Sequence, residues 1–144
     1  MSVDLEETMD IVANESPLVN AITNAVTVND VAQIILHWGG LPVMADDERE
    51  VGDMVAASEV CLLNMGTVSE AGESAMLAAG RAANDAGVPV VVDPVGAGST
   101  PTRDRVATRL LTELDVAILH GNHGATTSTP SHHPAGPRRR SARP

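Results

Sequence analysis

The chain of 144 residues carries a formal net charge of −10, an apolar fraction of 43% and one aromatic residue, Trp38. Its length suits a single domain, and its acidic, lysine-free composition argues against binding to nucleic acid, which needs a basic surface. No apolar run approaches the roughly 18 residues of a membrane-spanning helix, so we expect no membrane partner. Because the amino terminus is acidic and unlike a signal peptide, we expect a cytoplasmic protein.

Charge is distributed unevenly along the chain. Every acidic residue lies between Asp4 and Asp115, whereas residues 121–144 contain four arginines and no acid. The acidic part fits a protein adapted to high salt, because a large net charge keeps proteins soluble.

Apolar periodicity predicts five strands that alternate with helices. This alternation implies right-handed crossovers and a mainly parallel sheet of the α/β class. Cys61 lies in the third strand, where a buried thiol is expected rather than a nucleophile. In chain order the predicted elements are a helix at 3–14, a strand at 18–22, a helix at 28–38, a strand at 41–44, a helix from 46, a strand at 59–64, a helix from 67 to 86, a strand at 90–92, a helix at 101–113 and a strand at 115–119.

Local signals predict where three of these helices begin. Thr27 is the expected N-cap of the second helix, whose apolar face includes Trp38. Residues 46–48 are all acidic, which the helix dipole favours in a first turn. Residues 67–70 (TVSE) have the pattern of a capping box, which predicts that Thr67 caps the fourth helix.

Residues 88–101 (VPVVVDPVGAGSTP) combine a strand, an acid, a glycine-rich turn and a helix start. The β-branched run at 90–92 is typical of a strand covered on both faces, so we expect it among the most buried positions. Asp93 follows at the carboxyl end of that strand, where ligands of open α/β sheets bind. Gly96 and Gly98 allow close backbone approach, and the helix start after them favours a phosphate. No Gly-Lys-Ser/Thr follows, so the turn is not a complete phosphate loop.

Six short motifs occur along the chain at 17–24 (PLVNAITN), 42–45 (PVMA), 63–67 (LNMGT), 82–89 (AANDAGVP), 93–96 (DPVG) and 121–122 (GN). Their order and spacing resemble the hydroxyethylthiazole kinase family of the ribokinase-like superfamily, and the resemblance covers residues 3–124. It implies a ribokinase-like three-layer α/β/α fold with a mainly parallel sheet. Because members of that family are much longer, residues 1–124 resemble the amino-terminal half of the kinase domain, and the fold is expected to be incomplete.

The resemblance also implies an activity. The family transfers a phosphoryl group from ATP, with Mg²⁺, to the hydroxyl of 4-methyl-5-(2-hydroxyethyl)thiazole in thiamine biosynthesis and salvage. The expected small-molecule partners are therefore the thiazole alcohol and ATP. The full-length family forms homotrimers with active sites between subunits, and a half-length chain has less surface with which to form such a trimer.

Four residues match the substrate side of the family. Met44 corresponds to the methionine that contacts the thiazole, although a methionine at the end of a short strand is also typical of core packing. By the same resemblance Asn24 lines this pocket, whereas the residues alone indicate an Asx turn, and both can hold. Gly66 and Thr67 border the substrate site in the family; the alternative is that Thr67 only caps a helix.

Three residues match the ATP side of the family. Asp93 corresponds to the acid near the metal and the phosphates, although an Asp-Pro pair alone is a common turn former. His120 stands where the family has Arg or Lys, of which the arginine contacts ATP, and Asn122 follows it; a mostly neutral histidine is a weaker phosphate partner. The superfamily pattern Asn-x-x-Glu, whose Glu helps to organise Mg²⁺, ends here in Ala125. No residue is assigned to catalysis, because the family's glycine-rich anion hole belongs to the absent second half.

Residues 125–144 differ in character from the rest of the chain. They contain no leucine, isoleucine, valine or methionine, and this composition predicts disorder. It is typical of a GC-rich gene read out of frame, which favours a frameshift after about residue 124 over a genuine linker. The chain is then a truncated thiazole-alcohol kinase without activity; the alternatives are a non-catalytic remnant that keeps part of the thiazole pocket, and an interaction protein that uses this tail.

Overall fold

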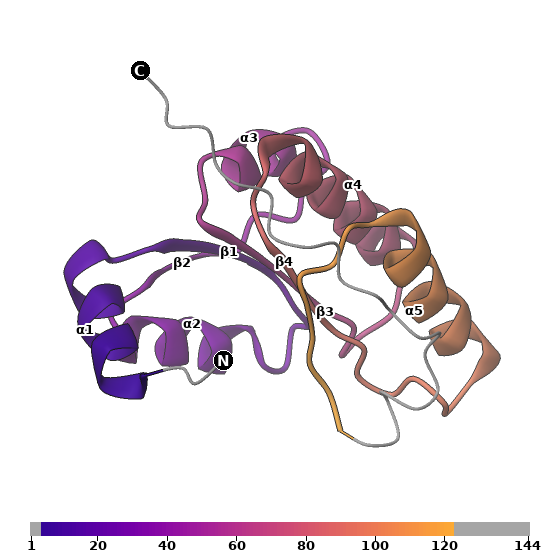
Figure 1. Ribbon diagram of the computed structural model, residues 1–144. Helices are drawn as coiled ribbons and strands as arrows, with labels where there is room; N and C mark the ends of the chain where they lie inside the picture. Colours follow the sequence, from indigo (N-terminus) through magenta and orange to yellow (C-terminus); the bar gives the residue numbers. More distant parts are fainter. Residues whose placement is uncertain (1–3, 123–144) are drawn as a thin grey trace.

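The computed structural model describes residues 4–122, which form a five-stranded parallel sheet with helices on both faces (Figure 1). The strand order is β2-β1-β3-β4-β5, and this arrangement confirms the predicted α/β class. The predictions for residues 125–144 lie outside the described residues. The strands are β1 (Leu18–Ile22), β2 (Leu41–Val43), β3 (Val60–Asn64), β4 (Val90–Asp93) and β5 (Ile118–Leu119), and the helices are α1 (Leu5–Glu15), α2 (Val28–His37), α3 (Val51–Ala56), α4 (Glu70–Ala86) and α5 (Pro101–Glu113).

One face of the sheet forms the core together with α3, α4 and α5 (Figure 1). Cys61 and Leu63 of β3 are register partners of Val90 and Val92 of β4, and all four side chains are fully buried on this face. Burial raises the pKa of the Cys61 thiol to about 12, which confirms the expectation of an inert buried thiol. Helices α1 and α2 lie on the opposite face, beside β1 and β2 (Figure 1).

The opposite face is covered only in part by residues 4–122. Val90 and Val92 are fully buried as expected, but Val91 between them is only half-buried. Its register partner on β5, Ile118, is 57% exposed. The expectation that the valine run is covered on both faces is therefore wrong for the described part of the chain, because no helix in it packs behind β4.

Helix α3 begins later than the acidic residues 46–48 predicted. Its first residue is Val51. Before it, Asp47 accepts a hydrogen bond at Oδ1 from the N–H of Arg49, at 2.9 Å. Aspartate side chains that bond to nearby backbone in this way favour a turn over a helix, so the acidic residues form the turn that precedes α3.

The capping box predicted for α4 is not formed. The helix begins at Glu70, and its N-cap is Ser69, whose Oγ accepts from the N–H of Gly72 at 3.0 Å. Thr67 lies outside the helix, in the turn that follows β3. A serine satisfies the free N–H groups of a first turn as well as a threonine does, and here Ser69 is the residue that lies next to the helix.

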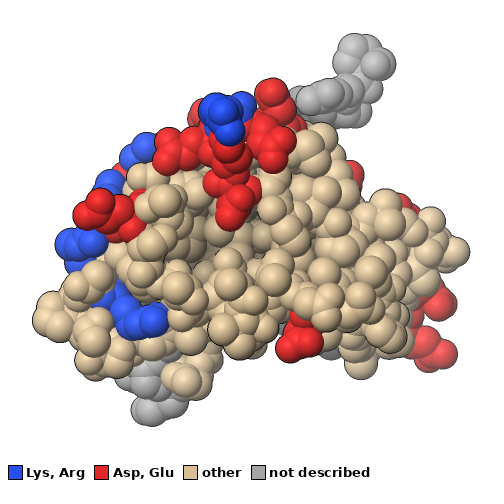
Figure 2. All heavy atoms as spheres, turned by 180° about the vertical axis from the view of Figure 1, so that it is seen from behind, with Lys and Arg blue, Asp and Glu red and all other residues tan. Residues whose placement is uncertain are grey.

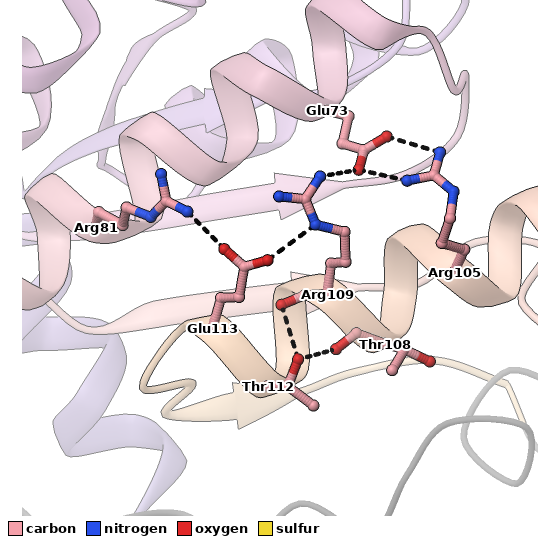
Figure 3. Close-up of polar contacts among 7 residues, drawn as sticks. All are labelled: Glu73, Arg81, Arg105, Thr108, Arg109, Thr112 and Glu113. Carbon is pink, nitrogen blue, oxygen red and sulfur yellow. Dashed lines mark hydrogen bonds and ion pairs between the residues drawn. The ribbon is translucent and has the colours of Figure 1, made fainter.

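Helices α4 and α5 are joined by an ion-pair network (Figure 3). Glu73 on α4, whose side chain is 8% exposed, accepts from Arg105 Nη1 at 2.8 Å and from Arg109 Nη1 at 2.6 Å. Glu113 joins Arg109 to Arg81, so the network runs along both helices. The hydrogen bonds from Arg105 and then Arg109 hold the pKa of Glu73 below its usual value despite burial of the carboxylate.

We expect Glu73→Gln to lower the urea midpoint at pH 7, because the uncharged amide cannot satisfy two guanidinium groups. A carboxylate whose folded pKa is lowered stabilises the fold above its unfolded pKa and stops doing so as the pH falls through the folded value. The difference from the wild type should therefore be full at pH 7 and shrink below about pH 4. Arg49→Gln removes a highly exposed ion pair and serves as the control, with little expected change. A deficit that is constant with pH would refute this account of the network.

Gly80 sets the distance between α4 and the segment before β5. A Cβ at Gly80 would lie 2.3 Å from Cδ1 of Leu114, which is 5% exposed. We expect Gly80→Ala to destabilise the protein by about 1 kcal/mol, since overpacking costs about 1–3 kcal/mol and alanine returns about 1 kcal/mol of helix propensity. In the control Gly52→Ala on α3, the added Cβ would have its nearest neighbour at 3.9 Å, so no loss is expected. Urea unfolding of both variants measures the difference, and a more stable Gly80→Ala would show that Leu114 repacks freely.

Candidate functional site

The residues that sequence analysis singled out follow the strands at one edge of the sheet. All five strands are parallel, so their carboxyl ends meet at the same edge. In the spatial order of the strands, the edge carries Met44 after β2, Asn24 after β1, Gly66 after β3, Asp93 at the end of β4 and His120 after β5. The substrate-side residues thus follow β2, β1 and β3, and the ATP-side residues follow β4 and β5.

The strand order reverses between β1 and β3. From β1 the chain crosses by α2 to β2, and it returns by α3 to β3 on the other side of β1. Such a reversal leaves a crevice between the carboxyl ends of the two strands, in which open α/β sheets bind their ligands. Asn24 follows one of these strands and Gly66 follows the other.

Asn24 forms the Asx turn that its sequence indicated, and it also reaches the turn after β3. Its Oδ1 accepts from the N–H of Val26 at 3.0 Å and of Thr27 at 3.1 Å, and its Nδ2 donates to Thr27 Oγ1 at 2.8 Å. Thr27 occupies the N-cap position of α2 as predicted, but its side chain makes no capping hydrogen bond to the helix. A Cβ at Gly66 would lie only 2.0 Å from Asn24 Nδ2, so glycine is needed for this approach.

Asn64 links this contact to the acid on β4. Its Oδ1 accepts from the Gly66 N–H at 2.8 Å, and its Nδ2 donates to Asp93 Oδ2 at 2.9 Å. Burial raises the pKa of Asp93 above its usual value, while the charge of His120 and the hydrogen bond from Asn64 act against this rise. An acid with a perturbed pKa at the ligand-binding edge is a candidate functional residue.

Arg103 on α5 is a residue of this site that sequence analysis missed. Its Nη1 donates to the carbonyls of Met65 at 2.8 Å and Val95 at 2.7 Å, and its Nη2 donates to the carbonyl of Gly66 at 3.2 Å. One guanidinium therefore joins the turn after β3 to the loop after β4. A signal was present, because a cation in the first turn of a helix opposes the helix dipole and needs another reason to be there.

The glycine-rich turn leads into a capped helix as predicted, but one of the backbone N–H groups that could bind an anion is already hydrogen-bonded within the chain. Gly96 and Gly98 have φ values of +76° and +87°, and Thr100 caps α5 by accepting from the Arg103 N–H at 3.3 Å. The Gly98 N–H donates to Asp104 Oδ1 at 2.6 Å. A phosphate at this helix start would have to compete with the carboxylate of Asp104 for that amide.

Three of the candidate residues are exposed to solvent. His120 and Asn122 lie exposed on the segment after β5, and Thr67 is exposed on the turn after β3. Within residues 4–122, no group of three or more His, Cys, Asp or Glu side chains could hold a metal ion. Asp93 alone still fits one ligand position of Mg²⁺, which proteins commonly bind through one or two carboxylates together with the phosphates of the substrate.

A separate groove lies at the opposite edge of the sheet, where α2 leads into β2. Its lining includes Met9 and Ala13 of α1 and Leu36 and Trp38 at the end of α2. Trp38 is 53% exposed, and α2 buries none of its residues completely, so the apolar face of this helix is left partly open to solvent in the described part of the chain. None of the candidate residues lines this groove. No helix among residues 4–122 has the length and hydropathy to span a membrane.

Comparison with known proteins agrees with this geometry. The sequence profile described as the hydroxyethylthiazole kinase family matches residues 9–133, which extends past residue 124, where the resemblance was expected to end. A protein of Natronomonas pharaonis named hydroxyethylthiazole kinase is 63% identical over 127 residues, and one of Haloquadratum walsbyi with the same name is 67% identical over 109 residues. These matches cover 88% and 76% of this chain and 46% and 38% of the two relatives, so the chain spans about half their length or less.

A solved structure shares the fold of this chain over about half of its own length. The structure of a hydroxyethylthiazole kinase protein from Pyrococcus horikoshii OT3 aligns with a TM-score of 0.82 and 38% sequence identity. The alignment covers 85% of this chain and 48% of the Pyrococcus chain. The sheet described here therefore corresponds to about half of that larger structure.

Removal of the Asp93 charge should stabilise the protein at neutral pH. Because the folded pKa of Asp93 is raised, charging this group costs more in the folded than in the unfolded state, and the penalty is present above the folded pKa. We expect Asp93→Asn to raise the urea midpoint at pH 7 and to lose this advantage below about pH 4, where the unfolded group is protonated too. Asp46→Asn, in an exposed loop, is the control. A destabilised Asp93→Asn at pH 7 would mean that the hydrogen bond from Asn64 outweighs the cost of burial.

Proposed function

The chain belongs to the hydroxyethylthiazole kinase family, and we propose that it provides the thiazole-binding half of such an enzyme. In this proposal, the crevice between β1 and β3 binds 4-methyl-5-(2-hydroxyethyl)thiazole, which the complete protein phosphorylates with Mg²⁺ and ATP in the cytoplasm. One observation carries the proposal. Asn24 and Gly66 follow the two strands that flank the reversal of strand order, and Met44, from a third part of the sequence, follows β2, the neighbour of β1.

Each substrate-side residue has a distinct role in the proposed site. Met44 follows the short β2 and is half-buried, so its thioether is available to the face of an aromatic thiazole ring. The Asn24 amide is held by Thr27 and by its own turn, and a group held in one orientation binds a ligand at a lower entropic cost. Gly66 leaves room for this amide, and the exposed Thr67 beside it borders the crevice.

The ATP side of the proposed site lies on β4 and β5. Asp93 would hold the Mg²⁺ that accompanies ATP and neutralises charge on its phosphates. His120 and Asn122 would face the nucleotide from the segment after β5. Asn64 joins Asp93 to the turn at Gly66, so the acid is linked through one side chain to the proposed substrate pocket.

Phosphoryl transfer itself needs groups that stabilise the charge of the transferring phosphoryl, and none is assigned within this chain. Loss of one such donor costs roughly 3–4 kcal/mol in the transition state, or about 10²–10³ in rate. We propose that the chain alone binds the thiazole alcohol and does not phosphorylate it. Calorimetry for binding and coupled detection of ADP for turnover separate these two properties.

We expect Met44→Asp to weaken binding of the thiazole alcohol by tenfold or more, because a charged carboxylate replaces an apolar contact worth about 1.5–3 kcal/mol. Met9→Asp provides the matched control, since Met9 is 44% exposed on α1 and lies in the groove at the opposite edge. Isothermal titration calorimetry with the thiazole alcohol measures both. Equal affinities for wild type and Met44→Asp would place the ligand elsewhere, and ATP turnover by the chain alone would overturn the division of roles.

A further inference from the structure

Asn20, in the middle of β1, is a polar side chain inside the apolar core. It is fully buried, as are Cys61, its register partner on β3, and Val90, the register partner of Cys61 on β4. Because register partners share a face of the sheet, Asn20 points with these two residues toward the layer of α3, α4 and α5. An apolar residue is the usual choice at such a position.

Asn20 differs from the other buried polar side chains of residues 4–122. Figure 2 shows acids and arginines on the surface of the molecule, and the buried polar or charged side chains of this part are those of Asn20, Ser58 and Glu73. Ser58 Oγ donates to the carbonyl of Met54 at 2.7 Å, and Glu73 accepts from two arginines. The Oδ1 atom of Asn20, in contrast, is buried without a hydrogen-bond partner among these residues. Such an atom costs folding free energy, so the asparagine needs another reason to be here.

The nitrogen of the same amide holds the segment that follows β2. Asn20 Nδ2 donates to the carbonyl of Ala45 at 3.3 Å. The register between β1 and β2 ends at Asn20 and Val43, so this bond reaches two residues beyond the last register pair. Met44 lies between these two points of attachment. β2 has three residues and lies at the edge of the described sheet, so its end is held by a strand on one side.

We propose that Asn20 is a positioning residue for Met44: its amide fixes the Ala45 carbonyl and thereby the place of the Met44 thioether in the proposed thiazole pocket. The inference rests on the proposed function. It accounts for the unpartnered Oδ1, because a group that is kept for ligand binding can cost stability. Ala45 is 9% exposed, so without the amide its carbonyl regains a hydrogen bond only by turning toward solvent, and this movement displaces Met44.

The test compares Asn20→Val with Cys61→Ala in the full 144-residue chain. Valine removes the unpartnered oxygen and suits a buried strand, so we expect the urea midpoint to rise or stay equal. Binding of the thiazole alcohol, measured by calorimetry, should weaken by about two- to tenfold, the equivalent of one hydrogen bond. Cys61→Ala changes the neighbouring position of the same buried row and removes only packing, so it should lower the urea midpoint and leave the affinity unchanged.

A second measurement needs no ligand. The chain contains six methionines, whose methyl groups are followed in a ¹H–¹³C spectrum, and the Met44 signal is assigned by its loss in Met44→Leu. We expect Asn20→Val to shift or broaden the Met44 signal, whereas Cys61→Ala leaves it in place. If circular dichroism shows that Asn20→Val does not fold, Asn20→Ala takes its place and is judged by the affinity and the Met44 signal.

The outcomes separate positioning from a purely structural role, which would change stability and affinity in the same direction. An unchanged affinity, a joint fall of affinity and urea midpoint in Asn20→Val, or an unmoved Met44 signal would each overturn the proposal. A wild-type chain that does not bind the thiazole alcohol would instead refute the proposed function. In that case the Met44 signal alone decides whether Asn20 positions this residue.

Discussion

The parallel arrangement of the five strands is the constraint on which the rest of the structure depends. Because every strand runs the same way, each one delivers the residues that follow it to the same edge, whatever their distance in the sequence. The reversal between β1 and β3 then decides where along that edge a ligand fits. Two turns that are far apart in the sequence meet there, and the close approach of Asn24 to Gly66 follows directly.

A continuous set of side-chain contacts links the turns at this edge. Asn24 lies against Gly66, the Gly66 N–H bonds to Asn64, and Asn64 bonds to Asp93. Arg103 on α5 donates to three backbone carbonyls and so joins the turn after β3 to the loop after β4. The substrate side and the phosphate side of the proposed site are therefore positioned by one connected unit, in which burial raises the pKa of Asp93.

Sequence analysis predicted the class of fold and the placement of the candidate residues well, because strand and helix periodicity is local and parallel topology follows from it. It was wrong about the starts of two helices, because neighbouring side chains compete for the same backbone groups. The acidic residues 46–48 favoured a helix start by their charge, but the Asp47 carboxylate accepts a hydrogen bond from the backbone of its own turn. Thr67 was predicted to cap the next helix, but Ser69 lies directly before that helix and caps it. Arg103 was missed although its place in the first turn of a helix was a signal, and its three carbonyl partners could not be identified because they come together only in the folded chain.

The two faces of the sheet differ in how far residues 4–122 bury them. Small residues on α4, among them Ala79, Gly80 and Ala83, let the helix approach the sheet closely, and α3, α4 and α5 form one core with β3 and β4. Arg103 of α5, a helix of this core, donates to the carbonyls of Met65 and Gly66 and so supports the proposed ligand-binding edge. The proposed substrate side is therefore held by elements within residues 4–122. The row of Leu62, Val91 and Ile118 and the exposed segment after β5 lie on the side of the sheet that this layer does not cover in residues 4–122.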